Sequence, residues 1–331
     1  MQETTAYVVA DGLKKAFGDF EAVKGISFDV QKGEVLGFLG PNGAGKSTTM
    51  KMLTGFLEPT EGQALIKGMP VTAGDVAPRK RIGYLPEGAP LYGDMTVAAF
   101  LKFIAECHGF SGAELIVRVR DAADAVSLAS VMEKEIETLS KGYKRRVGLA
   151  AAILHGPDVL ILDEPTDGLD PNQKHEVRSL IKAMSEDRAI IVSTHILEEV
   201  EALCSRAIII AHGQIVLDGT PAELMRQSKY DGALVMLVEQ EECGNIISVL
   251  SGLDGVDEIE AVQEGDQTRL TVIPKRGVQL SDPVGEVAVQ KGWTISQFAV
   301  ETGRLDDVFR SVTQGGDADD LVHPIDKGDA E

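Results

Sequence analysis

A glycine-rich run followed by a lysine and two hydroxyl residues lies near the start of the chain. It consists of Gly40, Pro41, Asn42, Gly43, Ala44, Gly45, Lys46, Ser47 and Thr48. Glycines let the backbone turn tightly enough to aim successive N–H groups inward, where they form a nest for phosphate oxygens. Lys46 is then placed to reach the outer phosphates, and the Ser47 hydroxyl to hold Mg²⁺. In this spacing the run predicts a nucleoside triphosphate site, whereas a chance glycine-rich turn is the structural alternative.

Two further groups follow apolar runs later in the chain. Asp163 and Glu164 come directly after Val159–Leu162, and His195 follows Ile190–Ser193 and Thr194. A carboxylate at a strand end can hold a metal, and its neighbour can orient or deprotonate the attacking water. His195 is a candidate γ-phosphate contact, although a lone histidine is more often a surface or core residue.

These residues need a parallel sheet to bring them together, and the first two thirds of the chain predict one. The expected strands are Val35–Leu39, Val159–Leu162 and Ile190–Ser193, with helices from Ser47 and at Asn172–Ser185. Apolar runs between helices are typical of an α/β domain, in which ligands bind at the carboxyl ends of the strands. The further expected elements are an all-helical insertion (Val97–His108 and Ala113–Leu128) and a closing hairpin (Ile208–Ile210 with Gln214–Leu217).

The composition bounds the number of domains and the class of partner. The chain has 331 residues, 44% of them hydrophobic, and a net charge of −20. A strong acidic excess disfavours a general electrostatic hold on nucleic acid. Residues 222–331 hold 22 acidic and 9 basic side chains, a shift that suggests a domain boundary near Pro221.

The region after this boundary predicts a small α+β domain. The expected strands are Ala233–Val238, Val256–Val262, Thr268–Ile273 and Trp293–Val300, and the expected helices are Cys243–Leu250, Val284–Lys291 and Leu305–Val312. The order β-α-β-β-α-β is the ferredoxin-like arrangement. We therefore predict domains at residues 1–221 and 222–313, followed by an acidic, disordered tail at 314–331.

Targeting signals and covalent cross-links are not expected. No run approaches the roughly 18 apolar residues of a membrane-spanning helix, and the N-terminus does not read as a secretion signal. The three scattered cysteines (Cys107, Cys204 and Cys243) suit a reducing cytosol better than a disulfide framework or a zinc site.

Five short motifs, in this order and spacing, make the chain similar to the ATP-binding subunits of ABC transporters. Leu139-Ser140-Lys141-Gly142-Tyr143 resembles the family's signature, Asp167–Asp170 its D-loop and Ser193–His195 its H-switch. Glu87 occupies the Q-loop position, and Phe17 the position of the aromatic residue that stacks on adenine. The resemblance covers residues 7–221 and implies a P-loop ATPase fold with a helical insertion.

The resemblance also implies a mechanism. Two such domains, from two copies of this chain or from this chain and a paired ATPase subunit, face head to tail and bury two ATP molecules. Each ATP lies between the Gly40–Ser47 loop of one domain and the signature of the other. Ser140 and Gly142 are then expected to contact the γ-phosphate, and Asp170 to reach across the interface. Mg²⁺ is expected at Ser47, Asp163 and Glu87. Hydrolysis, with Glu164 and His195 as the catalytic residues, reopens the pair.

The chain departs from the family pattern at two places. Glu87 stands where glutamine is usual, which places a carboxylate toward the metal, and Lys141 and Tyr143 replace residues of the signature. Both departures resemble the ATPases of ABC-2-type exporters, in particular the gliding-motility-associated ATPase, and so does the run Leu305–Phe309. This branch implies separately encoded membrane subunits and a location on the cytoplasmic face of the membrane.

Three functional hypotheses remain open at this point. The first is the energising subunit of a membrane exporter, with a docking surface between Glu87 and His108 whose apolar candidates are Tyr92, Met95 and Phe100. The second is a soluble ABC ATPase that remodels ribosomes or DNA. The third is a nucleotide-gated module that never hydrolyses ATP. For the C-terminal domain we expect a role in dimerisation or in regulating closure.

Overall fold

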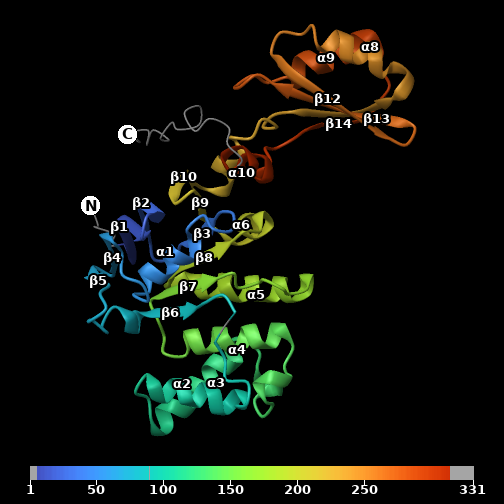
Figure 1. Ribbon diagram of the computed structural model, residues 1–331. Coiled ribbons are helices and arrows are strands. Elements are labelled where there is room, and N and C mark those ends of the chain that lie inside the picture. The colour runs from blue at the N-terminus through green and yellow to red at the C-terminus, as the bar shows by residue number, and fades with distance from the viewer. Residues whose placement is uncertain (1–5, 89, 314–331) are drawn as a thin grey trace. The chain divides into compact units, whose positions relative to one another are not determined.

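The computed structural model describes residues 6–88 and 90–313. Contacts divide the chain into two compact units, Met1–Thr220 and Pro221–Glu331. We describe each unit by itself (Figure 1). The predicted acidic tail, residues 314–331, lies outside the described residues.

The first unit is built on a six-stranded sheet of order β10-β9-β3-β8-β7-β6. Its strands are β3 (Val35–Leu39), β6 (Ile82–Leu85), β7 (Val159–Asp163), β8 (Ala189–Thr194), β9 (Arg206–Ala211) and β10 (Gln214–Gly219). All neighbouring strands are parallel except β9 and β10, which form the predicted antiparallel hairpin. Every residue of β3, β7 and β8 is buried, as expected of a parallel sheet covered on both faces.

A second, antiparallel sheet of order β2-β1-β4-β5 was not predicted. Its strands are β1 (Val8–Phe17), β2 (Phe20–Val30), β4 (Glu61–Ile66) and β5 (Met69–Pro70). Register shifts interrupt the pairing of β1 with β2, so the inward and outward positions do not alternate cleanly along the sequence. The hairpin between β1 and β2 places Phe17 opposite Phe20.

Helix α1 (Lys46–Leu53) lies in the hydrophobic core between the two sheets. Met50, Met52 and Leu53 of this helix belong to one buried cluster with residues of both sheets, among them Leu13 of β1 and Phe38 of β3. Burial of this apolar surface fixes the start of α1 next to the end of β3.

The remaining helices of this unit include the predicted insertion. They are α2 (Val97–Cys107), α3 (Gly112–Ala125), α4 (Lys141–Ile153), α5 (Pro171–Met184) and α6 (Leu197–Leu203). Helices α2, α3 and α4 lie together on one side of the unit, beyond β6 (Figure 1). The segment β7-α5-β8 is the predicted βαβ unit.

The second unit has the order of elements predicted from the sequence. After α7 (Pro221–Met225) come β11 (Leu234–Glu239), α8 (Gln240–Leu250), β12 (Val256–Glu264), β13 (Gln267–Pro274), α9 (Ser281–Lys291), β14 (Ile295–Val300) and α10 (Leu305–Thr313). The strands form an antiparallel sheet of order β12-β13-β11-β14, and α8 and α9 contribute to a core on one of its faces. Within residues 6–88 and 90–313, no helix is long and apolar enough to cross a membrane.

Candidate functional site

The loop between β3 and α1 has the conformation that its glycines allow. Gly45, the N-cap of α1, has φ of 109°, a left-handed conformation that side chains rarely adopt. At Gly40, a Cβ atom would lie 2.5 Å from the carbonyl oxygen of Ile210. Because Gly45 contributes no side-chain oxygen, the first N–H groups of α1 are left to an external acceptor, which makes this helix start suitable for an anion.

Lys46 is held against this loop. Its side chain is buried, and Nζ donates hydrogen bonds to the carbonyl oxygens of Gly40 at 2.6 Å and Pro41 at 3.2 Å. Burial lowers the pKa of Lys46, while the carboxylates of Glu164, Asp163 and Glu87 act in the opposite direction. Burial and the nearby carboxylates thus act in opposite directions on the positive charge of Lys46.

Asp163 connects the ends of two strands to the start of α1. Its Oδ1 atom accepts a hydrogen bond from Ser193 Oγ, at the end of β8, and lies 3.4 Å from Ser47 Oγ. The carboxylate is only 2% exposed. A carboxylate and a hydroxyl oxygen at this separation are a donor set that suits Mg²⁺, which takes its other ligands from water and phosphate.

Glu164 and His195 form a direct pair. The imidazole Nδ1 of His195 donates to Oε2 of Glu164 at 2.9 Å. Burial raises the pKa of Glu164, and the hydrogen bond from His195 opposes this shift. Glu164 has φ of 49°, a conformation uncommon for a residue with a side chain. The strand end thus holds a buried carboxylate whose orientation is set by an imidazole.

Glu199 braces this region, and sequence reasoning missed it. The side chain is 2% exposed and accepts hydrogen bonds from the hydroxyl groups of Thr166 and Thr194. It therefore joins the loop after β7 to the end of β8 next to His195. In the sequence Glu199 lies in an ordinary acidic helix turn, so its burial could not be read from the pattern.

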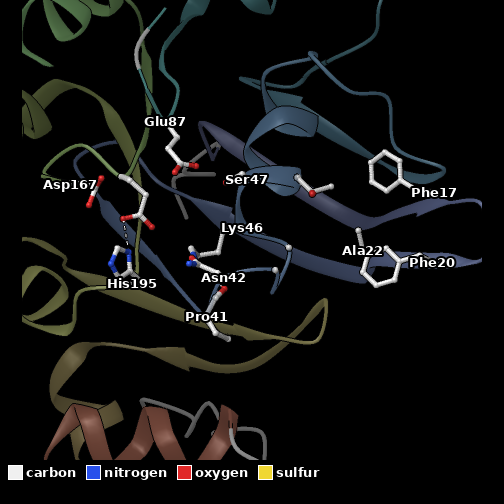
Figure 2. Close-up of a pocket in the computed structure, with 14 residues that line it drawn as sticks. Phe17, Phe20, Ala22, Pro41, Asn42, Lys46, Ser47, Glu87, Asp167 and His195 are labelled. Atoms are coloured by element: carbon white, nitrogen blue, oxygen red, sulfur yellow. Dashed lines mark hydrogen bonds and ion pairs between the residues drawn. The ribbon is translucent and has the colours of Figure 1, made fainter. Parts of the chain in front are cut away.

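A pocket of about 590 Å³ lies over these groups. It is lined by Phe17, Phe20, Ala22, Pro41, Asn42, Gly43, Gly45, Lys46, Ser47, Thr48, Glu87, Glu164, Asp167 and His195. Phe20, Ala22 and Asp167 are additions to the predicted set. Phe17, Phe20 and Ala22 lie at one end of the pocket, and His195 and Asp167 lie at the other (Figure 2).

Of the predicted residues, Gly40, Ala44 and Asp163 are chain neighbours of lining residues but do not line this pocket themselves, and Ser140, Gly142 and Asp170 lie outside it. Ser140 is the N-cap of α4 and accepts from Tyr143 N at 3.4 Å, and Asp170 is the N-cap of α5 and accepts from Gln173 N at 3.0 Å. A Cβ atom on Gly142 would lie 2.7 Å from the side chain of Gln173. These residues therefore gather around two neighbouring helix starts, apart from the glycine-rich loop.

The predicted docking surface needs one correction. Phe100 is 2% exposed and belongs to the core of the helical insertion, so it is not a surface contact. Tyr92 is 55% exposed, and its ring packs edge-on against Phe103, which is 39% exposed and was not predicted. The exposed aromatic pair is thus Tyr92 with Phe103. Met95 is half-buried.

Comparison with known proteins decides the family. Residues 23–167 match the model of the ABC transporter family. The Nod factor export ATP-binding protein I of Burkholderia lata is 33% identical over 305 residues, which are 91% of this chain and 95% of that protein. The chain belongs to the ABC transporter ATP-binding proteins.

Two other similarities extend this ABC assignment. The probable multidrug ABC transporter ATP-binding protein YbhF of Escherichia coli is 39% identical over 225 residues, 68% of this chain, and the match spans only 39% of YbhF. A solved structure described as the ATP-binding subunit of an ABC transporter has 31% identity and a TM-score of 0.61, covering 67% of this chain and 92% of that one. The ABC-type P-loop ATPase fold is therefore established.

Proposed function

We propose that this ABC protein binds and hydrolyses ATP as the energising subunit of a membrane exporter, with two copies closing around two nucleotides. One observation carries the proposal. The pocket of a single chain unites the phosphate loop with the Glu164–His195 pair, whereas Ser140, Gly142 and Asp170 lie outside it. A second copy can supply those three groups to the γ-phosphate, so that each complete site draws on both chains.

ATP fits the pocket from end to end. The glycine-rich loop and Lys46 bind the phosphates, and Phe17 at the far end stacks on the base. Ser47 and Asp163 would hold Mg²⁺, with Glu87 on the pocket wall as a further oxygen donor. When bound there, the ion would supply neutralisation of the phosphate charge.

The chain's own residues then perform the proton chemistry. Glu164 orients the attacking water and takes its proton, and its raised pKa brings this base closer to neutral pH. His195 holds the carboxylate in place through Nδ1 and presents the rest of its ring toward the γ-phosphate. Loss of the γ-phosphate removes the group that both copies contact. The closed dimer is then no longer more stable than the open one, and it reopens.

Exporter function is supported by the names of relatives and by an exposed surface. Those relatives are named for multidrug transport and for Nod factor export. The aromatic pair Tyr92–Phe103 offers apolar contact to separately encoded membrane subunits on the cytoplasmic face of the membrane. Within the exporters, the motifs at Glu87 and Ser140–Tyr143 favour the ABC-2 type and, more narrowly, the gliding-motility-associated branch. The acidic surface disfavours nucleic acid as a partner.

The variant Glu164→Gln tests the proposal. Removing the base should lower the ATP hydrolysis rate by ~10²–10⁴-fold. ATP binding should persist, so the variant should accumulate as an ATP-bound dimer, measured by light scattering with chromatography, and should form far less dimer with ADP at the same protein concentration. Glu186→Gln, at an exposed glutamate on the same unit, is the matched control and should behave as wild type. An unchanged hydrolysis rate in Glu164→Gln, or failure to pair in ATP, would contradict the proposed function.

A further inference from the structure

The two edges of the sheet in the second unit differ in chemistry. Strand β12 forms one edge and carries four acidic residues: Asp257, Glu258, Glu260 and Glu264. Strand β14 forms the other edge, and its sequence Ile-Ser-Gln-Phe-Ala-Val contains neither a charge nor a proline. Edge strands are normally protected by charges, proline or a covering segment, because their unpaired backbone groups attract another strand.

Two large apolar side chains lie exposed on β14. Phe298 is 42% exposed and Val300 is 58% exposed. They pair with Met236 and Leu234 of β11, so both lie on the same face of the sheet as its core. The edge strand therefore has backbone N–H and C=O groups that face no other strand of this sheet. It also carries two exposed apolar side chains at positions two residues apart.

The backbone of β14 shows which groups point away from the sheet. The N–H and C=O groups of Glu301 both bond toward β11, to Ala233 and Gly232. Because these directions alternate along an antiparallel strand, the corresponding groups of Ala299 point the same way. Those of Phe298 and Val300 point outward.

We propose that β14 pairs with β14 of a second copy of this chain, in an antiparallel register centred on Ala299. In this register the outward N–H and C=O groups of Phe298 hydrogen-bond those of Val300 in the second copy. The groups of Val300 likewise bond those of Phe298 in the second copy, so one two-fold axis generates both sets of hydrogen bonds. The same symmetry packs each phenyl ring on a valine, a favourable cross-strand pair.

Self-complementarity is the argument for a second copy as the occupant, because one two-fold axis pairs Phe298 with Val300 in both directions. Residues 222–331 carry a net charge of −13, so like charge opposes the approach of two copies. Strand β14 adds no charge of its own to that repulsion, whereas β12 carries four carboxylates, three of them paired with Lys229 or Arg269. A single strand pair buries less than the roughly 1,200 Å² of a standard interface. We therefore expect a weak association that is concentration-dependent and needs no nucleotide.

Cysteine trapping tests this pairing directly. Across the two-fold axis, Ala299 faces Ala299 of the second copy in a non-hydrogen-bonded pair, with a Cα–Cα distance of about 4.5 Å, within the range of a disulfide. The full-length variant Ala299→Cys, with Cys107→Ser and Cys243→Ser to remove the accessible native thiols, should form a disulfide-linked dimer under mild oxidation without nucleotide. The matched control is Ala261→Cys in the same background, an exposed alanine on the opposite edge β12. It should cross-link about tenfold less.

Two added variants separate this pairing from closure around ATP. Adding Phe298→Lys to Ala299→Cys should reduce cross-linking about tenfold, because a charge is placed on the edge. Adding Lys46→Ala instead, which removes a phosphate contact, should leave cross-linking unchanged. Equal cross-linking at positions 299 and 261, or cross-linking that survives Phe298→Lys, would overturn the proposal and leave the proposed ATPase function untouched.

Discussion

The first unit contains two sets of residues for which we propose phosphate contacts, and the two sets differ in burial and hydrogen bonding. On the phosphate-loop side, Lys46, Asp163 and Glu164 are each less than a tenth exposed and hydrogen-bonded to neighbouring groups. On the signature side, Ser140 is exposed and caps α4 through a contact of 3.4 Å. One chain thus holds the first set in place by its own hydrogen bonds, while Ser140 of the second set is exposed. This difference is what the proposed two-chain site predicts.

Mixing two inactive variants tests this division with the largest expected effect. Lys46→Ala removes the phosphate-loop side, and Ser140→Arg blocks the signature side, so each variant alone should lose ATP hydrolysis. In an equal mixture, half of the dimers combine one chain of each kind and contain one intact site. The mixture should therefore recover about a quarter of wild-type activity, measured as phosphate release.

The control places both defects in the same chain. Mixing the double variant Lys46→Ala/Ser140→Arg with Lys46→Ala leaves every possible site damaged and should give no recovery. If the first mixture also stays inactive while both variants still bind each other, the two sets do not meet across a dimer.

The phosphate-loop side was also the more predictable from sequence. Strands β3, β7 and β8 are continuous apolar runs, and the residues that follow them define the pocket. The N-terminal sheet was missed because β1 mixes charged residues with register shifts, and Phe20 was missed with it.

Other features depend on contacts between segments that are distant in sequence. Glu199 is buried only because Thr166 approaches it from another loop, and Phe100 is buried by the packing of the helical insertion. Neither environment is visible in a local pattern. The contacts proposed for Ser140, Gly142 and Asp170 across a dimer interface stay predictions, because they involve a second chain.

Glu87 lies between the phosphate-loop residues and the residues at the start of α4. It lines the nucleotide pocket and also a second pocket that contains Lys141 and Arg145 of α4. Replacing this charge by the amide usual in the family, Glu87→Gln, removes an attraction for Mg²⁺. We expect the Mg²⁺ concentration for half-maximal hydrolysis to rise about threefold, with a smaller change in maximal rate.

A magnesium titration of ATP hydrolysis measures this effect. Glu137→Gln is the matched control, because Glu137 lines only the second of these pockets. An unchanged magnesium requirement in Glu87→Gln would remove Glu87 from the metal site and leave it a role in contact with α4.

Acid should loosen the signature side before the phosphate-loop side. His155, just after α4, stacks on His108 of the helical insertion with ring centroids 4.1 Å apart, and its Nδ1 is buried without a partner. Burial, together with His108, lowers the pKa of His155 from 6.5 to about 4. Because the pKa of His155 is lower in the folded state than in the unfolded state, the folding stability is highest above pH 6.5 and decreases as the pH falls from 6.5 to 4. At pH 5 the loss should be ~2 kcal/mol, or a few degrees in Tm.

Thermal unfolding between pH 7 and 5 measures this loss, and hydrogen exchange locates it. The variant His155→Phe should lose less Tm over this range than wild type, while His175→Gln, at an exposed histidine, should follow wild type. Exchange at pH 5 should rise first in α2, α3 and α4. The unfolded chain binds a proton at His155 at a pH where the buried imidazole does not, so acid lowers the free energy of unfolding. We therefore expect the helices packed around the stacked histidines to open first. Faster exchange in β3 and β7 than in these helices would mean that acid acts first on the carboxylates of the phosphate-loop side.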